Sequence, residues 1–479
     1  MKINLKNIVI LGSSLVLFTM CRPGIKNGQL LAHLADSIFD SISAVNYQNY
    51  CAGCHGDHME EFTDRHWMFA NTQEEIERII KHGEENMGMP GFTKALNDDE
   101  IESLTLHILS ESVKRPEERK TDLRAYSKEE VKGELKYWAE LVVADLEVPW
   151  GLEFLPNGDL LIAERNGKLS RYTKNKELVS IEGLPPIRVS GQGGLMDLRL
   201  HPDYNKNGWV YISYSYIDDE NKEAGNTAII RAKLEGNHLT DIEHLYKGRP
   251  AVTTSHHFGS RIEFDREGYL YFSIGDRGHR DEFPQSLNNS NGKIHRLFDD
   301  GRVPPDNPFV QVKGAVKSIY SYGHRNPQGL SMHPVTGDIW ESEHGPRGGD
   351  EINIIRKGQN YGWPVISYGI NYDGTIFTND TAMEGMLQPI HYYVPSIAPC
   401  GQTFVTSKRY KGWENNLLIG SLRFKYLERV AIKEDKVVDR ERLLEGIGRV
   451  RNVRVSPDGY IYVAVEQPGK ILRIVPVEN

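Results

Sequence analysis

The sequence between residues 152 and 162 reads LEFLPNGDLLI, and this stretch decides the fold. A short apolar strand runs into a Pro-Asn-Gly turn, and a second apolar strand follows directly. The same unit returns along the chain, with turns such as Asp-Arg-Glu-Gly or Pro-Asp-Gly between its two strands. The six copies lie at residues 152–162, 198–212, 262–272, 330–340, 403–419 and 453–463.

β repeats spaced by roughly 45 to 75 residues are typical of propeller blades, and six four-stranded blades use about the length available. An array of β-sandwiches would not need such similar turns in every copy. The sequence therefore predicts a mainly β fold, a six-bladed β-propeller over residues 137–479. Its chemistry is expected in the loops at the mouth of the central channel.

The composition excludes several broad classes of protein. The 479 residues include 66 acidic and 57 basic side chains, a formal net charge of −9, which argues against nucleic-acid binding. A mean hydropathy of −0.49 excludes a membrane protein with many spans. Four cysteines, at positions 21, 51, 54 and 400, are too few for a disulfide scaffold. Cys400 stays unassigned, as a small buried residue or a free thiol.

The amino terminus has the pattern of an export signal. Two lysines precede an apolar run at residues 8–20, which is too short to span a bilayer. Residues 1–20 resemble a bacterial lipoprotein signal, in which Cys21 is lipidated, although Met20 departs from the small residue usual there. An ordinary cleaved signal is the alternative. We expect an exported, periplasmic protein with residues 21–39 as a tether and membrane contact only through the lipid anchor.

The motif Cys51-Ala-Gly-Cys54-His55 is the attachment signature of c-type haem. Two thiols bind the haem vinyl groups, and the histidine ligates the iron. A redox dithiol or half of a zinc site would also use two cysteines, but the chain has no second pair and no strand–helix context. Two helical patterns with capping boxes follow, at residues 72–83 and 97–108.

The sixth iron ligand is expected downstream of the motif. Met89 precedes a proline, as in class I cytochromes, and methionine ligation raises the potential of the iron, which suits an electron acceptor. The rival ligands are Met87, His58, His66 and His82. Residues 40–113 thus form a small all-α cytochrome c domain, and the charged residues 114–136 form a solvated linker.

Five polar segments lie between the repeats. They read GQGGL at 191–195, HHFGSR at 256–261, GHRNPQG at 323–329, EHGP, DEIN and NYGWP within 343–364, and GRVRN at 448–452. In this order they resemble the soluble quinoprotein glucose and aldose-sugar dehydrogenases, six-bladed propellers that bind pyrroloquinoline quinone (PQQ). The similarity covers most of residues 140–479. With the haem motif, it implies PQQ, calcium and haem c as cofactors.

The resemblance implies a quinone site rich in arginine. Its expected residues are Gln192, Arg325, Asn326, Ser396, Arg423, Arg449 and Arg451. PQQ is a planar tricarboxylate, and guanidinium groups bind carboxylates through paired hydrogen bonds. Arg449 and Arg451 lie two apart on a strand and so point to one face. At Arg423 the family commonly has lysine. Without a quinone these arginines would be surface or blade-bridging residues.

Calcium takes oxygen ligands, including backbone carbonyls. The resemblance places the carbonyls of Gly345 and Pro346 on a calcium that touches the quinone. It places Glu351 and the Tyr361 carbonyl on a second, structural calcium, with Asp350 orienting the loop. Glu351 could instead be a carboxylate that caps a loop.

The resemblance makes His257 the catalytic base, and a neutral imidazole suits that role at neutral pH. Arg325 would stabilise charge that develops on the quinone oxygen. His256 stands where glucose dehydrogenases have aspartate, which leaves the preferred sugar open. The paired histidines could also form a transition-metal site.

We therefore expect a PQQ- and calcium-dependent sugar dehydrogenase that oxidises an aldose at C1 to the lactone. Electrons would pass from the reduced quinone to the fused haem and on to an external acceptor, a cytochrome or the respiratory chain. Alternatives are a sorbosone, other aldehyde or polyol dehydrogenase of the same superfamily, a calcium-dependent lactonase, and a non-catalytic sugar sensor. The last two leave the arginines and the haem without a role.

Overall fold

The computed structural model describes residues 41–55, 70–84, 88–112, 130–132, 135–466 and 468–477. The expected signal peptide, Cys21, the tether and most of the expected linker lie outside these residues. No helix in the described ranges is both long and apolar enough to cross a membrane.

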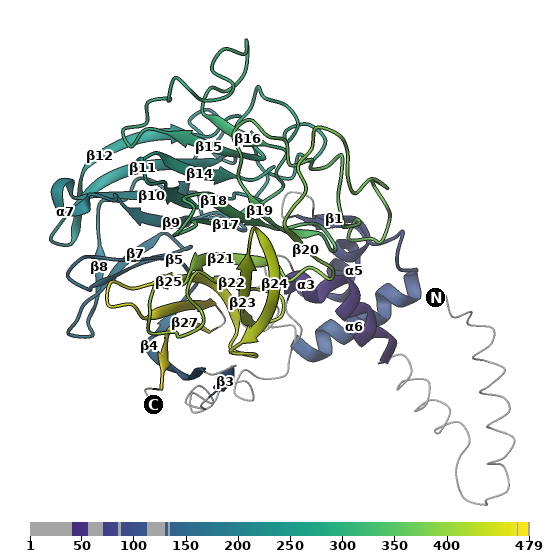
Figure 1. Cartoon of the computed structure of the whole chain (residues 1–479). Coiled ribbons are helices and arrows are strands. Elements are labelled where there is room, and N and C mark those ends of the chain that lie inside the picture. Colours follow the sequence, from purple (N-terminus) through teal and green to yellow (C-terminus); the bar gives the residue numbers. More distant parts are fainter. Residues whose placement is uncertain are drawn as a thin grey trace, which may run out of the picture.

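Six antiparallel sheets follow one another along the chain (Figure 1). The first sheet contains β5 (Pro149–Phe154), β6 (Leu160–Glu164), β7 (Lys168–Tyr172) and β8 (Leu178–Ile181), and the second contains β9 (Leu195–Leu200), β10 (Trp209–Ser215), β11 (Thr227–Glu235) and β12 (His238–Lys247). The third contains β13 (Ile262–Phe264), β14 (Leu270–Ile274), β15 (Lys293–Leu297) and β16 (Ile319–Tyr322), and the fourth contains β17 (Pro327–Met332), β18 (Ile339–Glu343), β19 (Asp350–Ile354) and β20 (His391–Tyr393). The fifth contains β21 (Pro399–Phe404), β22 (Leu417–Ser421), β23 (Tyr426–Lys433) and β24 (Lys436–Leu443). The short helix α7 (Tyr204–Asn207) lies between β9 and β10.

The sixth sheet joins both ends of the propeller. It consists of β25 (Arg449–Val455), β26 (Ile461–Glu466), β27 (Gly469–Pro476), β4 (Leu135–Leu146) and β3 (Glu130–Lys132), in that order. β27 pairs antiparallel with β4, with Ile474 opposite Ala139. The first strands of neighbouring sheets contact one another in a closed cycle that ends with β25 against β5. The predicted six-bladed propeller is therefore confirmed.

Buried groups hold the inner strands together at the centre of the ring. The guanidinium of Arg261 donates to the carbonyls of Gln328 (2.6 Å) and Arg451 (2.9 Å) and lies 3.4 Å from a carboxylate oxygen of Asp197. These four residues come from four different blades. The inner ends of the blades are thus fixed relative to one another, which gives the loops above them a rigid base.

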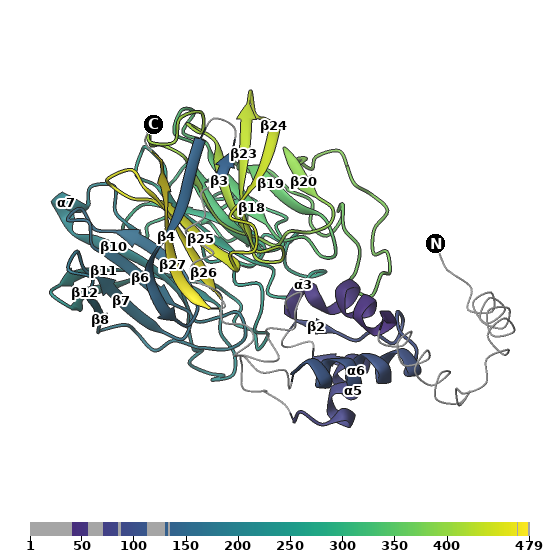
Figure 2. The same cartoon turned by 90° about the horizontal axis from the view of Figure 1, so that it is seen from below.

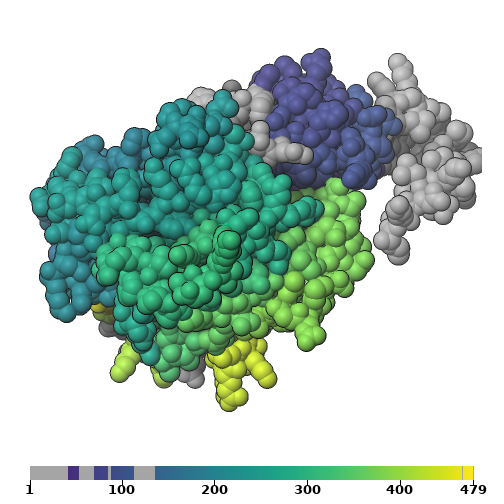
Figure 3. All heavy atoms as spheres, turned by 90° about the horizontal axis from the view of Figure 1, so that it is seen from above, coloured from purple at the N-terminus to yellow at the C-terminus, as the bar shows by residue number. Residues whose placement is uncertain are grey.

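The amino-terminal helices form a separate small core. They are η1 (Tyr47–Cys51), α3 (Ala52–His55), α5 (Gln73–His82) and α6 (Asp98–Ser112), with the short pair β1 (Gly83–Glu84) and β2 (Met89–Pro90). The expected capping box of α6 is present, because Asn97 and Glu100 exchange side-chain-to-backbone hydrogen bonds of 2.9 and 3.0 Å. The helices lie against the propeller, beside its loops (Figures 2 and 3).

Candidate active site

The expected site residues lie at one end of the propeller. In each blade the start of the first strand and the end of the second share one edge, because the strands are antiparallel. Gln192, His257, Arg325 and Ser396 shortly precede first strands, and Arg423 follows a second strand. The ring therefore brings loops that are far apart in sequence to a common face.

His257 is held by a carboxylate that the sequence analysis did not single out. Its Nδ1 lies 2.7 Å from Oδ1 of Asp276, and its backbone N–H donates to Oε1 of Gln192 at 2.9 Å. Asp276 also accepts hydrogen bonds from Nε1 of Trp363 at 2.9 Å and from the backbone N–H of Gly278 at 2.8 Å. Three donors fix the carboxylate, and the carboxylate fixes the imidazole.

The electrostatics of this pair suit a general base. Burial and the charge of Arg325 lower the pKa of His257, against the opposing effect of Asp276. Burial would raise the pKa of Asp276, but the charge and hydrogen bond of His257, the charge of Arg325 and the Gly278 N–H together lower that pKa below its usual range. At neutral pH the pair is thus a carboxylate and a neutral imidazole. Because Nδ1 donates to the carboxylate, Nε2 is the atom that can accept a proton.

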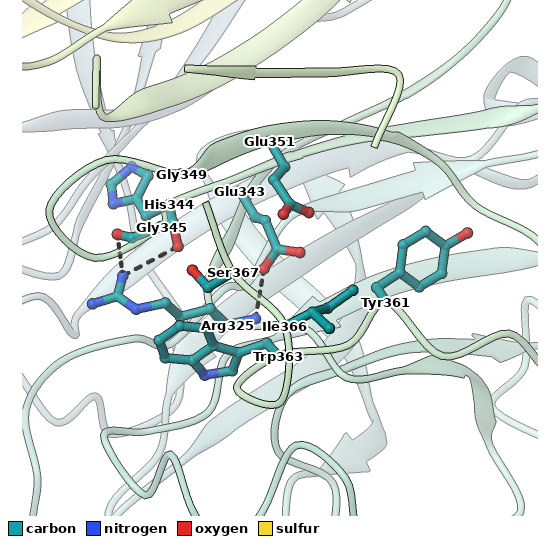
Figure 4. Close-up of a pocket in the computed structure, with 10 residues that line it drawn as sticks. All are labelled: Arg325, Glu343, His344, Gly345, Gly349, Glu351, Tyr361, Trp363, Ile366 and Ser367. Carbon is teal, nitrogen blue, oxygen red and sulfur yellow. Dashed lines mark hydrogen bonds between the residues drawn. The ribbon is translucent and has the colours of Figure 1, made fainter. Parts of the chain in front are cut away.

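The guanidinium of Arg325 has hydrogen-bond acceptors on one side only. Its Nη1 donates to the carbonyls of His344 at 3.1 Å and Gly345 at 2.7 Å (Figure 4). Its guanidinium lies 5.3 Å from the centre of the Trp363 ring, and its buried Nε has no hydrogen-bond partner among the described residues. An unpaired buried donor is costly, so this side of the guanidinium fits the oxygen of a bound ligand.

Asp350 ties together the two loops that carry Gly345, Pro346 and Ser396. Its Oδ1 accepts from the Gly345 N–H and the Ser396 hydroxyl, both at 2.8 Å, and its Oδ2 accepts from the amides of residues 397–398. The Ser396 hydroxyl also lies 3.1 Å from the Pro346 carbonyl. Burial raises the pKa of Asp350 to about 6. These contacts agree with the expected role of Asp350 in orienting the loop.

Arg449 and Arg451 point to one face, as their spacing predicts, and both contact Glu466 at the end of β26. Nε of Arg449 donates to Glu466 at 2.7 Å, while Arg451 donates through Nε at 3.2 Å and Nη2 at 3.0 Å. The Arg451 guanidinium also covers the ring of Trp150, 4.1 Å from its centre. Two guanidiniums on one carboxylate leave a positive charge in excess, which fits an anionic ligand.

Arg423 and Asn326 differ in what they offer a ligand. Nη1 of Arg423 donates weakly to the Ser396 carbonyl at 3.4 Å, and its buried Nε has no hydrogen-bond partner in the described part of the chain. Oδ1 of Asn326 accepts from the backbone N–H of Gly259 at 3.1 Å and from Nε2 of Gln328 at 3.2 Å. Arg423 therefore keeps a free donor, whereas Asn326 holds the loop that carries His257.

Carboxylates wall a small pocket beside these residues (Figure 4). Glu343, Glu351 and Tyr361 line it, and ligand atoms of His324, Glu341 and Glu343 lie within 4.8 Å of one another. Burial and the charge of Glu343 raise the pKa of Glu351 to about 8 and that of Glu341 well above its usual range. A hard divalent cation would relieve this repulsion, so the donor set fits calcium.

His256 packs against His257, with ring centres 4.6 Å apart and the rings edge to face. Burial and then the neighbouring His257 lower the pKa of His256 to about 2, so this imidazole is neutral. Among the described side chains, the metal-like group is His324, Glu341 and Glu343 rather than the paired histidines.

Two of the expected haem residues, Cys51 and Met89, share the core of the helical domain. Cys51 is buried at the end of η1, and the side chain of Met89 packs against the same cluster. His55 ends α3, one turn after the buried cysteine. This arrangement fits a haem held between the cysteine motif and Met89. Of the rival ligands, His82 is exposed at the end of α5. Met87, His58, His66 and the Cys54 side chain lie outside the described part.

Sequence reasoning missed Asp276 and Glu466, and it picked out the segment that begins at Glu343 without giving that residue a role. All three stand at or just after the end of a second blade strand. An acidic residue that ends a buried strand at the loop-bearing edge is a signal that the sequence does carry.

Comparison with known proteins identifies the two parts of the chain. Residues 146–473 match the Glucose / Sorbosone dehydrogenase family, and residues 43–108 match Cytochrome C oxidase, cbb3-type, subunit III. Aldose sugar dehydrogenase YliI of Escherichia coli (strain K12) is 39% identical over 343 residues, covering 70% of this chain and 92% of that protein.

Solved structures agree in fold. The apo form of the soluble aldose sugar dehydrogenase from Escherichia coli has a TM-score of 0.69 at 38% identity, covering 71% of this chain and 100% of its own. The PQQ-bound aldose sugar dehydrogenase from Streptomyces coelicolor has a TM-score of 0.59 at 27% identity, covering 72% and 99%. The chain therefore belongs to the glucose/sorbosone dehydrogenase family and carries a cytochrome c domain ahead of its propeller.

Proposed function

We propose that this dehydrogenase oxidises an aldose at C1 to the lactone with PQQ and calcium, and that its electrons pass to the fused haem c and then to an external acceptor. The observation that carries the proposal is the pair of His257 and Asp276, a neutral imidazole on a buried carboxylate, beside the unsatisfied guanidinium of Arg325. Cationic groups around this pair suit an anionic cofactor.

The chain's own residues supply the acid–base chemistry. Nε2 of His257 takes the proton of the C1 hydroxyl, while Asp276 holds Nδ1–H and stabilises the imidazolium that forms. The sugar loses this proton and a hydride, so one C–H bond breaks and a C=O bond forms. When bound, PQQ supplies the acceptor for that hydride. Arg325 is placed to stabilise the negative charge that develops on the acceptor oxygen.

The remaining cofactors follow from the same donor sets. Arg423, Arg449 and Arg451 would bind the quinone carboxylates, with Gln192, Asn326 and Ser396 at its edges. The Gly345 and Pro346 carbonyls would bind one calcium, and Glu351 with the Tyr361 carbonyl a second. Cys51, Cys54, His55 and Met89 would hold the haem.

We also propose a periplasmic location with a lipid at Cys21. A sugar dehydrogenase that carries a c-type haem needs an acceptor outside the cytoplasm, and the lipid would hold it near a membrane-bound respiratory chain. Mass spectrometry of the purified amino terminus tests the lipid directly.

The test of the proposed function is reconstitution with PQQ and calcium, followed by a panel of aldoses, sorbosone and polyols with an artificial dye. We expect aldose-dependent dye reduction that requires both cofactors and produces the lactone. A lactone that is hydrolysed without any dye reduction would favour the lactonase. If a polyol or sorbosone is oxidised faster than every aldose, the enzyme is a sorbosone or polyol dehydrogenase of the same superfamily.

A further inference from the structure

His256 lies where the haem domain meets the propeller. Its ring is enclosed by two glycines, one from each domain: a Cβ on Gly88 would stand 2.9 Å from Cγ of His256, and a Cβ on Gly278 would stand 2.4 Å from its Nε2. Gly88 directly precedes the expected iron ligand Met89, and His256 directly precedes the catalytic His257. Both glycines have positive φ, 80° and 77°, which glycine adopts without strain.

Other contacts extend this interface along the propeller loops. The guanidinium of Arg347 lies 5.2 Å from the centre of the Tyr50 ring, directly before Cys51. Tyr372 packs against the core cluster of the haem domain. Burial alone would raise the pKa of Asp373, but the hydrogen bonds from Thr375 and then the charge of Lys94 lower it. Contacts between two domains therefore occur at separate points around the haem motif.

The buried Nδ1 of His256 has no hydrogen-bond partner among the described residues. Its ring nevertheless touches groups on three sides: Gly88 of the haem domain, Gly278 beneath, and His257 edge to face at 4.6 Å. Because this imidazole is neutral and buried, it contributes to the interface through packing rather than through charge. It fills the gap between the catalytic pair and the segment of the expected iron ligand.

We propose that the haem domain docks on the mouth of the propeller through the contact of Gly88 with His256, and that this docked state carries the electron transfer. His256 is then a positioning residue, which sets the approach of the haem to the catalytic centre. The inference rests on the proposed function. Each sugar oxidation yields two electrons, so the iron is reduced from ferric to ferrous twice, and the external acceptor reoxidises it in between.

Two substitutions perturb the interface in different ways. Gly88→Ala places a methyl group against the imidazole, and Lys94→Glu replaces an attraction to Asp373 by a repulsion. Hydrogen–deuterium exchange in the haem-loaded full-length protein, without quinone or sugar, reports the docking itself. We expect the amides of residues 254–257 and 370–374 to exchange about tenfold faster in Gly88→Ala and roughly three- to tenfold faster in Lys94→Glu.

A charge exchange provides the matched control. Adding Asp373→Lys to Lys94→Glu restores the attraction and should return the exchange rates toward those of the unmodified protein. The absorption spectrum of the ferric haem should stay unchanged in Lys94→Glu, which shows that the iron ligands are intact.

Stopped-flow measurement of haem reduction after adding sugar then connects docking to function. In Lys94→Glu the rate of haem reduction should fall while turnover with the dye stays unchanged. The charge exchange, Lys94→Glu with Asp373→Lys, should restore the rate of haem reduction. Unaltered exchange and haem reduction in both variants would overturn the inference while leaving the proposed function intact. Absent dye turnover in the unmodified protein would overturn the proposed function, and the exchange experiment would still decide the docking.

Discussion

Replacing Asp276 by asparagine should nearly abolish turnover without removing any atom of the catalytic base. The native carboxylate accepts three hydrogen bonds, from His257 Nδ1, Trp363 Nε1 and the Gly278 N–H. Asparagine offers one acceptor oxygen and one NH₂ group in the same space. His257 Nδ1 and the Gly278 N–H share Oδ1, whereas Trp363 Nε1 donates to Oδ2. If the oxygen stays with Trp363, the NH₂ group faces Nδ1 and can only donate to it. The ring proton then moves to Nε2, and the base is lost.

The size of the effect follows from these bonds. A hydrogen bond to a charged group contributes about 1.5–3 kcal/mol, which corresponds to roughly 10- to 150-fold. Holding the wrong tautomer costs more, about 10⁴-fold in a serine protease triad. We therefore expect kcat to fall by about 10²- to 10⁴-fold, measured by dye reduction with saturating sugar. Because Asp276 opposes the lowering of the His257 pKa, the acid limb of any residual activity should move to lower pH.

Trp363→Phe is the matched control, since it removes one donor to Asp276 and leaves the contact of Asp276 with His257. This bond also goes to the ionised carboxylate, but the acceptor of the Nδ1 proton remains, so this variant should lose about tenfold, less than Asp276→Asn. Asp276→Asn with turnover within about threefold of the unmodified enzyme would show that the carboxylate does not orient the base.

Three further predictions concern the metal, the haem and the arginine pair. Burial and the charge of Glu343 hold the pKa of Glu351 at about 8 without a cation, so ionising this carboxyl lowers the stability of the fold as pH rises above the unfolded-state pKa near 4.5. Calcium binds the ionised form. The increase in Tm on adding calcium, measured by calorimetry, should therefore grow between pH 5.5 and 8. Met89→His should lower the haem potential in a redox titration, whereas Met87→Leu should not. Glu466→Gln should lower the free energy of unfolding by about 3–5 kcal/mol at pH 7 in urea denaturation, because two buried guanidiniums lose their partner. Added PQQ should recover part of that loss if the pair binds its carboxylates, and no recovery would contradict that role.

The sequence was most informative where local chemistry repeats. The turn at residues 155–159 returns in each blade, so the number of blades and the inner strands could be predicted. The outer strands could not, because their alternation is weak: β24 leaves most of its side chains exposed. The pairing of β4 with β27 joins the two ends of the propeller, and local patterns could not predict it. Strands β3 and β4 both begin inside the expected linker, at Glu130 and Leu135.

The site shows the same limit. His257, Arg325 and Glu343 stand in conspicuous polar segments, and Glu343 accepts from the backbone N–H of Arg325. Asp276, the partner of His257, is an ordinary acidic residue after a buried strand. In each case the antiparallel pairing of the first two strands of one blade brings the partner within reach. Glu466 is an instructive case, since it is 15 residues from Arg451 in sequence yet bonds to it at 3.0 Å through the β25–β26 hairpin. A search of strand ends for acids would have found all three.

The pairing of β27 with β4 has a consequence for folding during synthesis of the chain. Arg473 and Glu140, which form an ion pair across that seam, are separated by 333 residues. The seam therefore cannot form until nearly the whole chain is present, and β4 has an open edge until then. Long-range pairing of this kind slows folding. The helical domain is free of that constraint, so it can fold while the ring is still an open arc.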